Sequence, residues 1–261
     1  MENNYVSVYK IIVEKFSQIG HNGTIHFSVA KEERVVTLRN ATRVTPDGMR
    51  ENVESAIISE FSVDLYVNDE QRIKLVCTPT HIMELAVGRL ISEGYITCTD
   101  EIESAYMDEK GENVSFRISK TDAPLKEEYV VMEDAFYETE WIFRMIDAFT
   151  KEGQLHKKTK AAHSCILGRK GEVLFQCEDI GRHNAMDKAI GYMYLNKIKP
   201  QECMLFTSGR VPTEMAHKAI MAGIPVLISK AVPTDRALKM AQQYNLKLIC
   251  KAWPDSFEIF N

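Results

Sequence analysis

Hydrophobic and polar residues alternate most regularly from residue 61 onward, and this alternation predicts a β-hairpin. The segment Phe61 to Val67 places an apolar side chain at every second position. The turn-forming pair Asn68-Asp69 follows, and residues 73–77 return as a second apolar segment. Two short segments around such a pair are typical of antiparallel strands joined by a tight turn.

Two helices are predicted from apolar residues that recur at helical spacing. The first should follow the hairpin directly, with Thr78 as its cap, Pro79 in its first position and Gly94 at its end. The second should run from about Glu133 to Lys151, shortly before a glycine that stops it. Each helix carries its apolar residues on one face.

The rest of the chain predicts alternating strands and helices. Strands at 163–167 and 173–177 should form a hairpin that turns at residues 168–171. Helices are then expected at about 184–195, 212–222 and 235–244, and strands at 204–207, 226–229 and 247–250. Such alternation is typical of a sheet with parallel neighbours and covering helices. Ligands bind these sheets beyond the carboxyl ends of the strands.

The first 55 residues carry weaker signals. A segment rich in valine and isoleucine lies at 5–16, and the polar stretch from Arg43 to Glu51 contains a proline and a glycine and is predicted to be a loop. We therefore expect an N-terminal extension over residues 1–55, a smaller lobe over 56–130, and an α/β core domain with the ligand site over 131–261.

Composition and charge narrow the classes of function. The chain has 261 residues, of which 45% are hydrophobic and 26% charged, as in ordinary globular proteins. The net charge of −5 provides no general positive field for nucleic acid or an anionic membrane, so a phosphate-bearing ligand must be held locally. The start of the chain lacks the features of a signal peptide, and we expect a cytoplasmic protein.

The six cysteines form no CxxC pair, so we expect neither a zinc site built on a cysteine pair nor disulfides. Three of them, Cys77, Cys203 and Cys250, lie in apolar strands and are expected to be core residues. Cys165 and Cys177 bracket the hairpin beside a charged segment, where Arg182 or a protonated His163 would stabilise a thiolate. They are the candidates for sulfur chemistry.

Three polar segments stand between predicted strands and helices. Residues 178–188 are dense in charge, and Gly181 permits a tight turn before three side chains able to bond phosphate, a purine edge or a carbonyl. Mutual pairing at about 0–1 kcal/mol per exposed pair is the alternative. Residues 207–210 precede a helix start and suit an anion, or form an ordinary turn. In residues 231–236, Thr234 or Asp235 is expected to cap a helix.

Four motifs together resemble the FdhD/NarQ family. They are TPTHIMELAVGRLISEGYI at 78–96, EDIGRHNAMDKAIG at 178–191, LFTSGRVPTEMAHKA at 205–219 and AVPTDRALKMA at 231–241, in the order and spacing of that family. The resemblance implies a three-layer α/β/α core similar to the cytidine-deaminase fold, with a smaller N-terminal lobe, and a homodimer. It also implies a sulfurtransferase that takes sulfur from a cysteine desulfurase and passes it to bis-molybdopterin guanine dinucleotide for formate dehydrogenase.

The resemblance also implies which residues bind this molybdenum cofactor, for which GDP or GTP would be a mimic. The matching positions are Asp179, Gly181, Arg182, His183, Asn184, Asp187, Lys188, Ser208, Gly209, Arg210, Glu214, Lys218, Pro233 and Thr234. A C-terminal segment is similar to one that holds the nucleotide end in the family: Lys251, Ala252, Trp253, Pro254, Asp255 and Ser256. The catalytic candidates are Cys165, Cys177 and His163.

Two departures from the family pattern leave three hypotheses. Residues 123–137, where the family carries its sulfur-bearing CxxC, contain no cysteine, and the family's TGGxH turn reads TKAAH at 159–163. The chain is therefore a sulfurtransferase with a relocated cysteine, a non-catalytic binder of the cofactor or of a guanine nucleotide, or a deaminase. A deaminase needs H-x-E and P-C-x-x-C segments, which the chain lacks. The family function is our first hypothesis and the binder our second.

Overall fold

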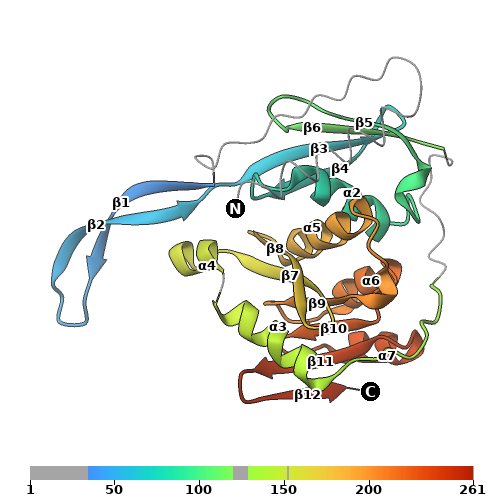
Figure 1. The fold of residues 1–261 in the computed structure, drawn as a ribbon. Helices are drawn as coiled ribbons and strands as arrows, with labels where there is room; N and C mark the ends of the chain where they lie inside the picture. The colour runs from blue at the N-terminus through green and yellow to red at the C-terminus, as the bar shows by residue number, and fades with distance from the viewer. Residues whose placement is uncertain (1–34, 120–128, 152, 261) are drawn as a thin grey trace.

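The computed structural model describes residues 35–119, 129–151 and 153–260 (Figure 1). The apolar segment predicted at 5–16 lies outside the described residues. Residues 123–128, the first part of the region without cysteine, also lie outside them. The described chain forms two larger sheets and one two-stranded sheet. None of its helices in these ranges is long and apolar enough to cross a membrane.

The larger sheet has six strands in the order β12-β11-β10-β9-β7-β8. Their bounds are β7 His163–Arg169, β8 Glu172–Asp179, β9 Met204–Thr207, β10 Val226–Ser229, β11 Lys247–Trp253 and β12 Ser256–Phe260. Strands β9, β10 and β11 run parallel, whereas β7 pairs antiparallel with both β8 and β9. The five strands predicted here are confirmed, and β12 was not predicted.

Helices cover both faces of this sheet. Three helices, α5 Arg182–Leu195, α6 Thr213–Met221 and α7 Asp235–Gln243, share a buried cluster with Leu205, Leu227 and Leu248. On the other face, α3 Thr139–Lys151 packs on Phe206, Ile228 and Ile249. Adjacent residues of a strand point to opposite faces of the sheet. Leu205 and Phe206, for example, therefore belong to the two different buried clusters. The mixed α/β class is confirmed, and the likeness to the cytidine-deaminase fold stays a prediction.

The second of the two larger sheets has four strands. Its order is β4-β3-β6-β5, with β3 Phe61–Val67, β4 Glu70–Cys77, β5 Ile102–Met107 and β6 Asn113–Ile118. The predicted hairpin is β3–β4, and Asn68 and Asp69 form its turn with φ angles of 49° and 67°. Helix α2, Ile82–Ser92, joins this sheet to the core because it packs against α5. The short 3-10 helices are Thr99–Glu101 and Pro200–Glu202.

A two-stranded arm projects from the body of the molecule (Figure 1). It consists of β1 Val36–Val44 and β2 Arg50–Ile58. The predicted loop at 43–51 is therefore wrong at both ends, because Arg43 and Glu51 are paired strand residues joined by an ion pair of 2.6 Å. Only the five residues between the strands form the turn, and Gly48 supplies its positive φ of 84°.

The predicted starts of the first two helices, at Thr78 and at about Glu133, are also wrong. In each case the expected first residues lie in segments held by contacts to distant parts of the chain. Thr78 does not cap α2, since its hydroxyl accepts the Ile180 N–H at 3.1 Å. Helix α2 begins four residues later. Helix α3 begins six residues after Glu133. The segment before the helix is held outside it by Asn245, which follows α7 and donates to the Met132 carbonyl at 3.0 Å.

Helices α2 and α5 cross with their backbones in contact. A Cβ atom on Gly88 would lie 1.8 Å from the Asp187 carbonyl oxygen, and one on Gly191 would lie 1.8 Å from the Glu84 carbonyl oxygen. Real Cβ contacts are never so close, so both positions require glycine. This crossing ties the smaller sheet to the helix that carries the charged segment of residues 178–188.

The first prediction concerns this crossing. Alanine normally stabilises a helix by about 1 kcal/mol relative to glycine. Here we expect Gly88→Ala to lower the free energy of unfolding by at least about 2 kcal/mol, because the added methyl group overlaps a backbone carbonyl. Urea denaturation measures the effect. Lys239→Ala, on the exposed surface of α7, is the control and should change the free energy of unfolding by no more than about 0.5 kcal/mol. A Gly88→Ala protein as stable as the wild type would contradict the crossing.

Candidate functional site

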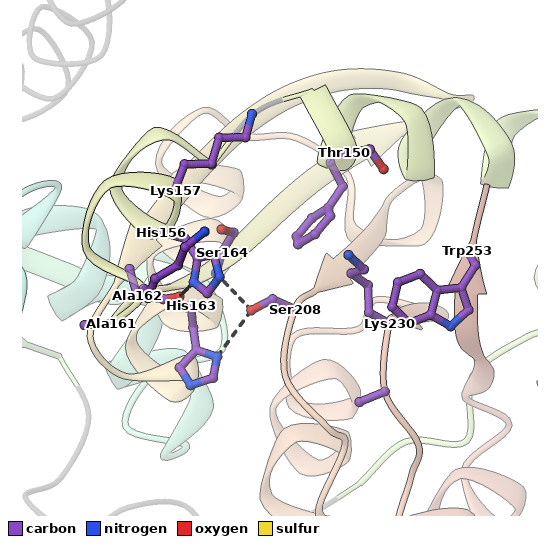
Figure 2. A pocket seen from close by; sticks show the side chains of 14 residues that line it. Thr150, His156, Lys157, Ala161, Ala162, His163, Ser164, Ser208, Lys230 and Trp253 are labelled. Atoms are coloured by element: carbon purple, nitrogen blue, oxygen red, sulfur yellow. Dashed lines mark hydrogen bonds between the residues drawn. The ribbon is translucent and has the colours of Figure 1, made fainter. Parts of the chain in front are cut away.

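A cavity of about 630 Å³ opens beyond the carboxyl ends of β9, β10 and β11. The short helix α4, Gln154–Thr159, and the end of α3 form its opposite wall (Figure 2). Three lysines line the cavity, Lys157, Lys160 and Lys230, together with two histidines, and none of its described lining residues is acidic. A cavity whose charged lining residues are lysines, in a chain of net charge −5, indicates a site for an anion.

His163 and Ser208 meet on one side of the cavity (Figure 2). The Ser208 hydroxyl accepts the Ser164 N–H at 3.1 Å and lies 3.2 Å from His163 Nδ1. Burial lowers the pKa of His163, and the neighbouring Arg182 and His156 lower it further. His163 is therefore neutral near pH 7 until an anion approaches, and an anion would favour its protonated form.

Lys230 stands at the aromatic side of the cavity. Its Nζ lies 4.6 Å from the centre of the Trp253 ring and 5.2 Å from that of Phe149. Both distances are within the range of cation–π attraction, which holds the ammonium group in place without neutralising it. The Trp253 ring, which is 46% exposed, is available as a flat surface for a ligand.

Arg182 adjoins the cavity beneath Gly209. A Cβ atom on Gly209 would lie 3.0 Å from Arg182 Cδ and 3.7 Å from His163 Nδ1, so glycine is what permits the guanidinium stem to pass. Arg182 Nε is buried and has no hydrogen-bond partner among the described residues. A buried donor of this kind is costly unless a ligand accepts from it. Arg210, by contrast, is exposed and does not line the cavity.

Asp179, Asn184 and Asp187 are buried, whereas Glu178 is half-buried and accepts from the Leu155 and His156 N–H groups of α4 at 2.7 and 2.8 Å. The Asp179 carboxylate is fully buried and forms an ion pair of 2.6 Å with Lys188 Nζ, which is also fully buried. Asp179 accepts from the Thr78 and Gly181 N–H groups and from the Asn184 amide, at 3.0, 2.9 and 3.0 Å. Lys188 donates in addition to the Thr78 carbonyl at 3.1 Å. Gly181 has a φ of −109°, so its role is small size and not left-handed backbone.

A second buried pair involves Asp187, the residue of α5 directly before Lys188. Lys218 Nζ donates to both oxygens of Asp187 at 2.7 and 2.9 Å, and Ser92 donates to the same carboxylate at 2.8 Å. Arg89 Nε lies 3.0 Å from Asp187 Oδ2. Burial lowers the pKa of Lys218, and the Asp187 charge opposes that shift. These groups join α2, α5 and α6 inside the protein.

A second cavity, of about 650 Å³, opens at the start of α6. His183 Nε2 lies there 3.4 Å from Glu214 Oε2, and burial lowers the pKa of His183. His217 donates from Nε2 to the Ser92 carbonyl at 2.9 Å, and its Nδ1 lies 2.8 Å from Tyr129 Oη. The lining of this second cavity contains both acidic and basic residues, so their charges compensate one another.

The remaining predicted binding residues are separated from one another. Thr234 caps α7 by accepting the Ala237 N–H at 3.3 Å, as the sequence predicted, and Pro233 bridges to Val211. Of the C-terminal segment, only Trp253 lines the main cavity; Ala252 is buried and Lys251 pairs with Glu258 at 2.8 Å. Pro254, Asp255 and Ser256 are exposed at the turn into β12.

Cys165 and Cys177 do not provide the accessible thiolate that the sequence analysis required. Cys165 and Cys177 are 0% and 4% exposed and face each other across β7 and β8. Burial raises the pKa of Cys177 to about 12, and its thiol donates to the Ala185 carbonyl at 3.1 Å. The neutral His163 supplies no positive charge for either thiol. Cys77, Cys203 and Cys250 are buried, as predicted, and Cys98 is partly exposed.

Sequence reasoning named only three of the fourteen residues that line the cavity as site candidates, His163, Ser208 and Trp253. Lys230 follows the predicted strand at 226–229 directly, so its position at a carboxyl end was a usable signal. Lys157, Lys160 and His156 belong to or follow α4, a six-residue helix that no periodicity indicated. Only the folded chain places α4 across from Lys230.

Comparisons with known proteins agree on one family. The sequence model of the FdhD/NarQ family matches residues 58–136 and 122–261. "Protein FdhD" from Methanocaldococcus jannaschii is 32% identical over 211 residues, covering 80% of this chain and 89% of the relative. "Sulfur carrier protein FdhD" from Bacillus pumilus is 28% identical over 229 residues, covering 78% and 87%.

A solved structure shares the fold. The crystal structure of a protein from Desulfotalea psychrophila, described as a candidate formate dehydrogenase accessory protein, superposes with a TM-score of 0.79. The two proteins are 25% identical, and the match covers 87% of this chain and 97% of the other. The residues matched by the family model include all lining residues of the main cavity.

The second prediction concerns the buried pair beside the cavity. We expect Lys188→Met to cost about 3–5 kcal/mol in the free energy of unfolding, because it leaves the Asp179 carboxylate buried without a countercharge. Adding Asp179→Asn should recover part of that loss. Arg144→Ala, which breaks an exposed pair with Glu140, is the control and should cost no more than about 1 kcal/mol. Equal losses from Lys188→Met and Arg144→Ala would contradict the buried pair.

Proposed function

Because the chain belongs to the FdhD/NarQ family, we propose that it serves formate dehydrogenase maturation by binding bis-molybdopterin guanine dinucleotide in the main cavity. The observation that carries this proposal is the lining of the cavity, which combines lysines, histidines and an exposed tryptophan without an acidic side chain among the described residues. This cofactor is the cargo. It brings the molybdenum centre of the dehydrogenase, and the chain's own residues hold and orient it.

The chemistry of the lining suits the parts of that cargo. Lys157, Lys160 and Lys230 offer ammonium groups to a pyrophosphate, and the Ser208 hydroxyl with His163 offers a further polar contact. The Trp253 ring offers a face on which a flat ring stacks. Arg182 Nε supplies a donor that the described protein leaves without a partner.

The buried residues of the 178–188 segment act in this proposal by positioning. Asp179, Asn184, Asp187 and Lys188, together with Lys218 of α6, bond to protein groups and hold the loops between strands and helices in place. Gly209 and Ser208 then lie against Arg182 and His163 because β9 and α5 are fixed relative to each other. Pro233 and Thr234 define the start of α7 in the same way.

Sulfur transfer is the second candidate function, and the name "Sulfur carrier protein FdhD" of the relatives favours it. A carrier needs a thiolate that attacks the persulfide of a cysteine desulfurase and later releases the sulfur. Cys165 and Cys177 are buried with raised pKa values, so cofactor binding has the stronger support. We further propose that the protein acts in the cytoplasm as a homodimer, with formate dehydrogenase as its client.

The third prediction tests the cavity with GDP as the probe. We expect Lys230→Gln to weaken GDP binding by about 10- to 100-fold, since a hydrogen bond to a charged group contributes about 1.5–3 kcal/mol. Titration calorimetry at low and moderate salt provides the affinities. Lys239→Gln, on the exposed surface of α7, makes the same change outside the cavity and should leave binding unaltered. If both variants bind as the wild type does, the cavity is not the nucleotide site.

The fourth prediction separates the two candidate functions. After incubation with a cysteine desulfurase and cysteine, intact mass spectrometry of the wild type should show no added sulfur, because the thiols of Cys165 and Cys177 are buried and protonated. Cys165→Ser, Cys177→Ser and Cys98→Ser variants are the matched set. A gain of sulfur that one of these substitutions abolishes would establish a relocated carrier cysteine and replace the binder proposal.

A further inference from the structure

Helix α4 forms the wall of the main cavity across from Lys230, yet its own sequence does not hold it in place. None of its six residues is buried, and a helix this short is not stable by itself in water. Gly153, directly before the helix, has a φ of 90° and provides no side-chain cap. The first N–H groups of a helix need acceptors from outside it. The position of this wall is therefore set by contacts with another element.

Glu178, near the end of β8, supplies those contacts. One oxygen of its carboxylate accepts the Leu155 N–H at 2.7 Å, and the other accepts the His156 N–H at 2.8 Å. A carboxylate suits the start of a helix because it satisfies the free N–H groups and because its charge is attracted to the positive end of the helix dipole. Glu178 thus caps α4 although it belongs to a different element.

The residue next to Glu178 fixes where its carboxylate stands. Asp179 points to α5 and forms the buried pair with Lys188, and neighbouring strand residues point to opposite faces, so Glu178 points to the side of α4. The Glu178 carboxylate also accepts the Ser164 hydroxyl at 3.3 Å, and the Ser164 N–H donates to Ser208 at 3.1 Å. Glu178 therefore connects α4 with the side of the cavity that carries Ser208.

Two other hydrogen bonds of α4 stay within its own part of the chain. His156 Nδ1 lies 2.7 Å from the Ala162 carbonyl, and Lys157 Nζ donates to the Lys151 carbonyl at 2.7 Å. Both acceptors belong to the segments that adjoin α4, so these bonds close the turns at its ends without tying it to the sheet. An ammonium group has three N–H donors, so Lys157 keeps donors for a ligand (Figure 2).

We infer that Glu178 is a positioning residue of the main cavity, which holds Lys157 of α4 and Lys160 directly after it across from Lys230. The phosphate groups of a ligand then meet ammonium groups from two sides. This inference rests on the ligand site proposed above. A wall that is free to move must be ordered when the ligand binds, and that ordering reduces affinity. Glu178 orders the wall before the ligand arrives.

The fifth prediction depends on the sign of the effect. If Glu178 acted only through its negative charge, its removal would strengthen the binding of an anion. We expect the opposite. Glu178→Gln should weaken GDP binding by about tenfold, because an amide has one accepting oxygen and one N–H group of α4 loses its partner. Titration calorimetry at low and moderate salt measures the affinities.

Glu172→Gln is the matched control. It makes the same change of charge at the exposed start of β8 and should alter GDP affinity by less than about twofold. A second comparison shows whether Glu178 acts through the lysines. In a Lys157→Gln, Lys160→Gln background, adding Glu178→Gln should change the affinity by less than about twofold, since the groups that it positions are gone, whereas independent effects would multiply.

Hydrogen exchange detected by mass spectrometry tests the hold on α4 without a ligand. Glu178→Gln should raise the exchange rate of residues 154–160 by about tenfold and leave that of α5 unchanged. GDP binding as tight as in the wild type, or tighter, would overturn the inference and leave the proposed ligand site standing. Unchanged exchange would overturn it as well. A wild type that binds no GDP would remove the proposed function and with it the ligand role of Glu178, while faster exchange would still assign the hold on α4.

Discussion

The buried ion pair between Asp179 and Lys188 is the interaction on which the rest of this structure depends. Two opposite charges are fully removed from water at 2.6 Å, and the remaining hydrogen-bonding capacity of both groups is taken up by backbone and amide groups. An ion pair so deeply buried is tolerated only when its partners are held in place on every side. The pair therefore fixes the end of β8, the first turn of α5 and the loop before α2 relative to one another.

From that fixed point the structure builds outward to the ligand site. Helix α5 lies against α2 through two glycines, and its first residue, Arg182, passes beneath Gly209 toward His163. The parallel strands β9, β10 and β11 then deliver Ser208, Lys230 and Trp253 to one cavity. The motif that looked most like a ligand-binding turn in the sequence thus consists largely of residues that support the cavity, with Arg182 next to it.

The burial of Cys165 and Cys177 argues against sulfur transfer by either of these two thiols. Transfer of sulfur requires a thiol that meets both donor and acceptor, and burial acts against that twice, by blocking access and by raising the thiol pKa. The cationic cavity is unaffected by the loss of the cysteine pair, since none of its lining residues is a cysteine in the part of the chain that the structure describes. The proposed binding function does not depend on a reactive cysteine.

The sequence by itself determined the order of the elements in the core, because alternating apolar segments of four to eight residues and turn residues are local signals, and it located strands such as Val226–Ser229 to the residue. It also identified the family and the loss of the cysteine pair. It did not determine which polar residues face a ligand. Asp179 and Lys188 are nine positions apart on paper, and only packing against Thr78 buries both. Lys157 and Lys160 belong to the site only because the tertiary structure places α4 across the cavity from β10. Burial and convergence depend on contacts between distant segments, and local sequence patterns carry no information about them.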